Sequence, residues 1–102
     1  MARSSELEDE FGRDMELVLK REKEVGLISV RFRQMIERWG AIGAARRLLE
    51  ADRELPPNTF TYLRSIDRLD LAMEYYVVMP KYGSLLSEAE RQIAAFRLRA
   101  ED

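Results

Sequence analysis

Apolar side chains recur at intervals of three and four residues along much of this 102-residue chain. That spacing puts each series on one face of an α-helix. Val77 and Val78, between two tyrosines, are the best candidate for a strand, but no second alternating run exists to pair with them. The pattern predicts an all-α fold, a compact bundle of five to six short helices. The two clearest series are Leu7, Phe11, Met15 and Val18, and Phe32, Met35, Ile36 and Trp39.

Capping residues, glycines and prolines divide the chain into the expected helices. Ser5 with Glu8, and Ser87 with Glu90, have the spacing of a capping box. Gly26, Gly40 and Pro80 are natural stops. The first predicted helix spans 5–24, the second runs from Ser29 to Gly40, and the third carries Ile42, Ala45, Leu48 and Leu49. The fourth is capped by Asn58 or Thr59 and bears Phe60 and Leu63. The fifth is capped by Asp70 and turns Met73, Tyr76 and Val77 inward, and the last turns Ile93 and Phe96 inward and reaches about Arg99.

The length predicts a single helical domain over residues 1–102, because domains most often contain about 100–150 residues. Its ends, 1–4 and 100–102, are expected to fray. The segment 52–58 contains Pro56 and Pro57 together and cannot continue a helix, so it is the predicted linker.

The missing residue types limit the possible chemistry. The chain contains neither cysteine nor histidine, so it lacks a thiolate, the commonest general base and the commonest metal ligand. We therefore expect no enzymatic activity, no catalytic residues, no cofactor and no metal. The longest stretch without a charged side chain, Leu55 to Leu63, is too short to span a membrane. A cytoplasmic protein without a membrane partner is expected.

The net charge is −2, but the two signs are separated along the first half of the chain. Residues 1–24 sum to −3 and residues 25–53 to +3. An acidic pI of about 5.3 argues against a dedicated nucleic-acid binder, because neutralising phosphates needs a clearly basic surface. A local basic patch remains open.

Two stretches, Phe32 to Leu49 and Arg68 to Leu98, resemble a family of small uncharacterised all-helical bacterial domains. Members of this family are found beside, or fused to, restriction, defence and mobile-element components. The resemblance implies an association with such components, and it identifies no catalytic residues. The chain departs from the family pattern at Ala72, where a threonine or serine is usual, and at Leu86, where a phenylalanine is usual. The matching features are Phe32 and Met35, Ala44 to Leu49, Arg68 to Leu71, and Pro80 with Tyr82.

Charged residues supply two candidate surfaces. The basic candidates could grip phosphates or an acidic protein, either as part of a helix-turn-helix or, as we favour, on the solvated face of a plain helical hairpin. The acidic candidates could imitate a phosphate backbone and dock on a partner's basic channel, although acid at a helix start also simply complements the helix dipole. The basic candidates are Arg31, Arg38, Arg46 and Arg47, and the acidic ones are Glu6, Asp9 and Glu10.

Aromatic residues supply the remaining candidates. Tyr75 and Tyr82, with Lys81 beside them, are expected on the surface as interface anchors, whereas Trp39 is expected in the core because its helical neighbours are apolar.

Three carboxylates, Asp67, Asp70 and Glu74, would share one face of a continuous helix and could hold Mg²⁺. We favour capping for Asp70, and ion pairs with Arg64 and Arg68 for the others.

These observations together predict a non-enzymatic interaction protein that binds a protein partner handling nucleic acid. One such role is a phage-type inhibitor of a bacterial CRISPR or restriction nuclease. The alternative is a weak, direct nucleic-acid binder that uses the basic helical hairpin.

Overall fold

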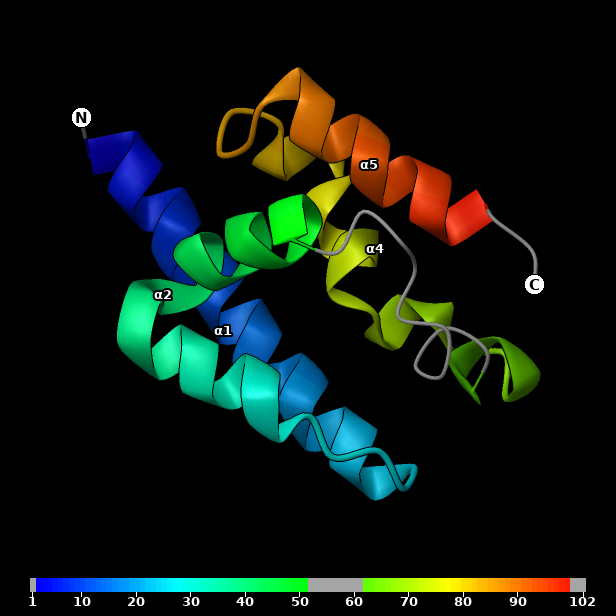
Figure 1. The fold of residues 1–102 in the computed structure, drawn as a ribbon. Coiled ribbons are helices and arrows are strands. Elements are labelled where there is room, and N and C mark those ends of the chain that lie inside the picture. Colours follow the sequence, from blue (N-terminus) through cyan, green and yellow to red (C-terminus); the bar gives the residue numbers. More distant parts are fainter. Residues whose placement is uncertain (1, 52–61, 100–102) are drawn as a thin grey trace.

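Two long helices lie side by side in the N-terminal half of a computed structural model that describes residues 2–51 and 62–99. Helix α1 (Ala2–Glu24) and helix α2 (Val30–Ala51) are joined by a short turn at Gly26 (Figure 1). Three of the four residues in the apolar series of α1 are buried as predicted: Phe11, Met15 and Val18 are each at most 1% exposed, whereas Leu7 is partly buried.

Helix α2 is two helical segments joined at Gly40, whose φ of 78° and ψ of 168° are not helical. The bend is visible in Figure 1, where the second segment leaves α1 and crosses toward the C-terminal elements. Only glycine adopts a positive φ of this kind without strain. The two predicted helices on either side of Gly40 are therefore confirmed, with almost no loop between them.

The C-terminal half is made of shorter elements. One helical turn at 62–65 is followed by the 3₁₀ helix η1 (Leu69–Leu71), the short helix α4 (Met73–Val77), the 3₁₀ helix η2 (Pro80–Tyr82) and helix α5 (Glu88–Arg99). Among the described residues there is no strand, and Val77 lies in α4. The all-α prediction is confirmed. A radius of gyration of 12.9 Å matches the ~13 Å expected for a compact chain of about 100 residues.

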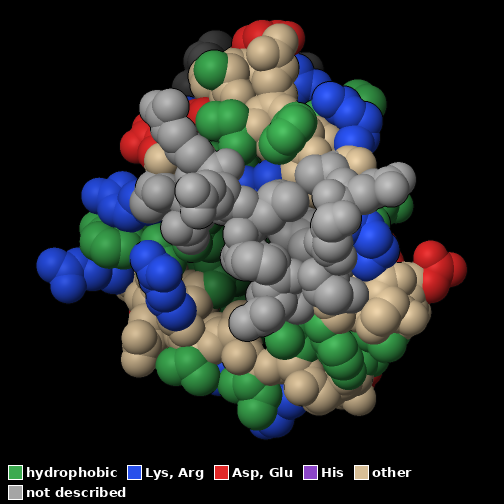
Figure 2. Space-filling model, turned by 45° about the vertical axis from the view of Figure 1, so that its right-hand side comes forward, with side chains coloured by type: hydrophobic (Ala, Val, Ile, Leu, Met, Phe, Trp, Pro, Cys, Tyr) green, Lys and Arg blue, Asp and Glu red, His purple; other side chains and the backbone are tan. Residues whose placement is uncertain are grey.

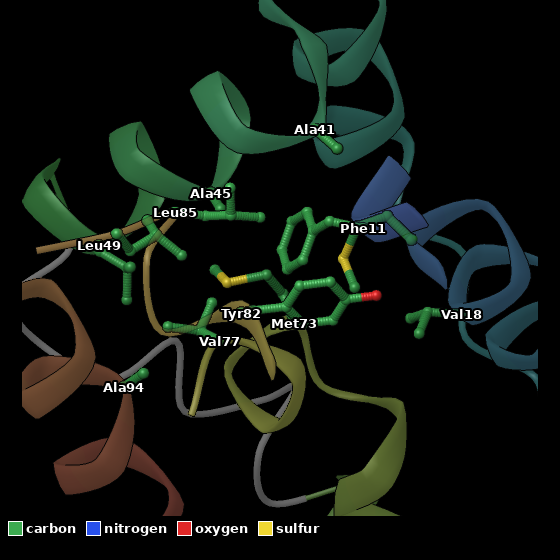
Figure 3. Close-up of a cluster of buried hydrophobic side chains, with 12 residues drawn as sticks. Phe11, Val18, Ala41, Ala45, Leu49, Met73, Val77, Tyr82, Leu85 and Ala94 are labelled. Carbon is green, nitrogen blue, oxygen red and sulfur yellow. The ribbon is translucent and has the colours of Figure 1, made fainter. Parts of the chain in front are cut away.

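The main core lies where α1, the second segment of α2, α4 and α5 meet. In Figure 3 the side chains of Phe11, Met73, Val77 and Tyr82 point toward one another. The rings of Phe11 and Tyr82 meet edge to face, with centroids 5.1 Å apart and planes at 88°. A smaller cluster, made of Leu63, Leu71 and Ala72, lies beside it.

The capping box predicted at the start of α5 is present. Ser87 Oγ accepts from the backbone N–H of Glu90 at 3.1 Å, and the backbone N–H of Ser87 donates to Glu90 Oε1 at 2.8 Å. The capping box predicted at Ser5 is wrong, because α1 begins three residues earlier, at Ala2. That start also overlaps the region 1–4 where fraying was expected.

Two further local predictions are wrong. Asp70 lies inside η1 and pairs with Arg68 at 3.1 Å, while the residue before α4 is Ala72, which has no capping side chain. Phe96 is 58% exposed, because α5 turns Ala94 and Arg97 inward instead. The predicted linker 52–58, the caps Asn58 and Thr59, Phe60 and the end 100–102 lie outside the described residues.

Candidate interaction site

Trp39 is exposed, contrary to the prediction that it belongs to the core. Its side chain is 41% exposed and lies at the end of the first segment of α2, directly before the bend. The guanidinium carbons of Arg47 and Arg38 lie 4.1 and 5.2 Å from its ring centroid. These are cation–π distances, so two arginines lie against the indole at the surface.

Two glycines lie next to Trp39. Gly40 breaks the helix directly after Trp39, so the apolar face of the first segment does not continue into the second. Gly43 lies against the base of the Trp39 side chain: a Cβ built on it would lie 2.9 Å from Trp39 Cβ, closer than real Cβ atoms approach. Any other residue at position 43 would displace Trp39 or the backbone.

A shallow hollow of about 460 Å³ lies beside Trp39, between the bend of α2 and the first half of α1. Its α1 wall is mainly acidic, with Arg13 as the one basic side chain among the lining residues described. The apolar indole and an acidic wall are therefore next to each other. The other residues lining the hollow are Glu8, Asp9, Gly12, Glu16, Gly40, Ala41 and Ile42.

The four basic candidates do not form one patch. Arg38 and Arg47 share Trp39. Arg46 instead donates to the backbone oxygen of Leu85 at 3.0 Å and lies 3.5 Å from a Glu90 oxygen, so it is used to attach α5. Arg31 lines a different cavity.

The acidic candidates are also divided. Glu6 and Asp9 are exposed on α1. Glu10 is paired with Lys81 across a 2.6 Å contact, and the hydrogen bond from Lys81 lowers the pKa of Glu10 below its ordinary value. Because this pair is exposed, its charges remain screened by water and it stabilises the fold little.

Tyr75 is 40% exposed, as predicted, and contacts Tyr76 edge to face. The prediction that Tyr82 is a surface anchor is wrong, because its side chain is fully buried and its hydroxyl donates to Asp14 Oδ2. Burial and that hydrogen bond raise the pKa of the Tyr82 hydroxyl. The cause of the error is η2, a tight turn after Pro80 that rotates Tyr82 inward while leaving Lys81 exposed.

The continuous helix that the magnesium alternative requires is not formed between residues 67 and 74, where a turn, η1 and α4 follow one another. No group of three or more carboxylates within residues 2–51 and 62–99 could hold a metal ion. Asp70 pairs with Arg68, and Glu74 is buried against Arg97. Asp67 lies in a turn with a positive φ of 58°.

Three buried charged residues were missed by the sequence analysis. Glu22, Glu74 and Arg97 are 5%, 5% and 1% exposed. A signal for one of them exists: Glu22 follows Val18 by four residues and so continues the apolar stripe of α1.

Figure 2 shows both signs of charge interspersed with hydrophobic side chains on one face of the molecule. None of the helices within the described residues is long and apolar enough to cross a membrane. No family model matches the chain, and neither curated proteins nor solved structures gave a significant match.

Proposed function

We propose that this chain is a non-enzymatic interaction protein whose docking site is the Trp39 hollow, and that its partner is a nucleic-acid-handling protein with a basic surface. The observation that carries the proposal is the exposed Trp39 between Arg38 and Arg47. Tryptophan and arginine are the side chains most enriched among residues that dominate binding energy. A partner that covered the indole would remove a large apolar surface from water.

The acidic side chains of the hollow support a partner with a basic surface. Glu8, Asp9 and Glu16 line its α1 wall, and a basic surface would pair with them. Proteins that handle nucleic acid carry such basic surfaces because they must neutralise phosphates. The resemblance to domains associated with defence systems supports the same class of partner, with inhibition of a CRISPR or restriction nuclease as the specific role.

Direct nucleic-acid binding is a second candidate, and it is favoured by the same aromatic residue. An exposed tryptophan between two arginines resembles the stacking platforms that hold single-stranded bases. The acidic wall opposes this role, because it would repel the phosphates that follow a stacked base.

The test of protein binding is affinity capture from host lysate with partner identification by mass spectrometry. Trp39→Ala and Asp9→Lys should each lose the partner. Glu24→Lys makes the same charge change at another exposed site of the same helix and should retain it. A partner kept by Trp39→Ala, or lost equally by Glu24→Lys, would contradict the proposed site.

The test of nucleic-acid binding uses the fluorescence of Trp39, the single tryptophan of the chain. We expect affinity for a single-stranded oligothymidine no better than ~10⁻⁴ M at physiological salt, the weak end of non-specific binding. Micromolar, salt-sensitive quenching that disappears in the double variant Arg38→Glu, Arg47→Glu would establish the second candidate instead.

A further inference from the structure

A second cavity, of about 290 Å³, lies at the opposite end of α1 from the acidic first turns. It is bounded by α1, the turn that follows it, both segments of α2, the start of α4, and α5. It reaches the surface beside Ile28 and Val30, which are 67% and 55% exposed. Most of its lining is apolar: Val18, Leu27, Ile28, Val30, Phe32, Leu48, Ala72 and Met73.

Three buried charged side chains line the same cavity, and two of them neutralise each other. Arg97 Nη1 donates to Glu74 Oε2 at 2.9 Å, and Arg97 Nη2 donates to the backbone oxygen of Leu48 at 3.1 Å. Glu74 balances the charge of Arg97, so this pair leaves no net positive charge in the cavity, although the buried Nε–H of Arg97 has no hydrogen-bond partner among the described residues.

Glu22 is the third charged group, and no cationic side chain in the described part of the chain forms an ion pair with it. Its Oε1 accepts a hydrogen bond from Ser29 Oγ at 2.9 Å, and no ion pair joins it to a described residue. Its Oε2 has no hydrogen-bond partner among the described residues and is not sealed from the exterior. A carboxylate that is 95% buried with one neutral donor is costly unless a cation joins it or a proton is taken up.

We propose that this cavity binds a small organic cation, an ammonium group attached to an apolar body, with the ammonium on Glu22 and the body against the apolar lining. An ammonium ion supplies the missing positive charge and donates to the open oxygen of Glu22. The cavity is large enough, since an engineered cavity of roughly 150 Å³ in another protein binds benzene.

The electrostatics of the cavity favour a cation over an anion. The three buried groups, Glu22, Glu74 and Arg97, sum to one negative charge when both glutamates are ionised, and the exposed Arg31 brings the whole lining to zero. Burial, and to a smaller extent repulsion by Glu74, raise the pKa of Glu22 to about 7, although the bond from Ser29 acts in the other direction. Arg31, the other basic residue of the lining, is exposed, so water screens its charge more than the charges of the buried groups.

The experiment titrates the whole protein with phenethylammonium by calorimetry and by chemical-shift mapping. We expect saturable binding, with the largest shifts at residues of the cavity lining. Phenethyl alcohol has the same body without the charge and should bind roughly tenfold more weakly or worse, because a charge-assisted hydrogen bond is lost. Hydrocinnamate, which carries a carboxylate, should bind more weakly still.

Two variants locate the binding. Glu22→Gln keeps the shape of the side chain but removes its charge, so it should lose the preference for the ammonium over the alcohol. Glu24→Gln, on the last turn of the same helix and outside the cavity, should behave as wild type. A thermal melt of each variant confirms that it is folded.

The wild-type protein gives a third measurement that does not depend on any variant. Phenethylammonium stays charged at neutral pH, whereas Glu22 loses its charge as the pH falls below about 7, with Ser29, Glu74, Arg97 and Arg31 as the polar groups around it. Affinity should therefore fall as the pH is lowered. Equal affinity for ammonium and alcohol, tighter binding of hydrocinnamate, binding unchanged in Glu22→Gln, or no binding up to about 10 mM would each overturn the proposal.

Discussion

Tyr82 and Trp39 flank the same stretch of α1 and have opposite environments. Tyr82 packs on Phe11 and donates to Asp14, with no part of its side chain exposed. Trp39 lies beside Glu8, Asp9 and Glu16 and is 41% exposed. The sequence pattern predicts the reverse for both. Helical periodicity therefore fails at residues where the backbone leaves the helical path, at Gly40 and at η2.

The largest effect on this comparison should come from Tyr82→Ala. Removing a fully buried aromatic ring leaves a cavity in the main core, so we expect a loss of ~3–5 kcal/mol in the free energy of unfolding. Urea denaturation followed by circular dichroism measures it. Tyr82→Phe keeps the ring and should lose only the bond to Asp14, about 1–3 kcal/mol. Equal, small losses in both variants would mean that Tyr82 is not part of the core.

The same contrast between interior and surface holds for two carboxylates, Glu22 and Glu10. Because the pKa of Glu22 is raised from 4.5 to about 7, the folded state binds its proton more tightly than the unfolded state. Its contribution to stability is therefore present below about pH 4.5 and is lost as the pH rises through about 7.

Glu22→Gln should consequently raise stability relative to wild type more at about pH 8 than at about pH 4, by up to roughly 3 kcal/mol. Urea unfolding at both pH values measures the difference. Glu10→Gln is the control with the opposite sign, because Lys81 lowers the pKa of Glu10. A Glu22→Gln effect independent of pH would show that Glu22 does not titrate in this range.

Trp39→Ala should cost less than Tyr82→Ala, within about 1 kcal/mol, because substitutions at exposed sites rarely cost more. The unfolding experiment used for Tyr82 decides this. The tryptophan emission of the wild-type protein gives an independent check, since an indole open to water emits at longer wavelength than a buried one. A loss of unfolding free energy comparable with that of Tyr82→Ala would show that Trp39 belongs to the core.

Lys81→Ala should have the smallest effect, with no measurable change in melting temperature at physiological salt. Lys81 and Glu10 are both exposed, so water and salt screen their pair. Differential scanning calorimetry at low and high salt is the measurement. A clear destabilisation at high salt would show that the pair fixes η2 against α1.

Much of the fold is predictable from the sequence because it rests on local signals. The stripe of α1, the break at Gly40 and the capping box of α5 each involve residues within four positions of one another. The short elements between residues 69 and 82 are less predictable, since 3₁₀ turns such as η1 and η2 are too short to show a period.

The candidate sites are less predictable than the fold because they depend on contacts between distant segments. Lys81 reaches Glu10 from 71 positions away, and Arg97 reaches Glu74 from 23 positions away. Nothing in the local pattern distinguishes these charges from those on a solvated surface. Trp39 illustrates a further difficulty, because it is exposed directly before the helix break at Gly40, although its own neighbours in the apolar series predict burial.

The bend at Gly40 also has a consequence for the order of folding. The first segment of α2 packs on α1 through contacts that are close in sequence, whereas the second segment, which also joins α1 in the main core, is tied to the C-terminal half by Arg46 to Leu85 and by Arg97 to Leu48, 39 and 49 positions apart. Local contacts form faster than those that must first close a long loop. We therefore expect the helical hairpin to form early and the second segment to become ordered only as α5 docks. The single residue at the bend would then separate an early-folding unit from a late one within what is nominally one helix.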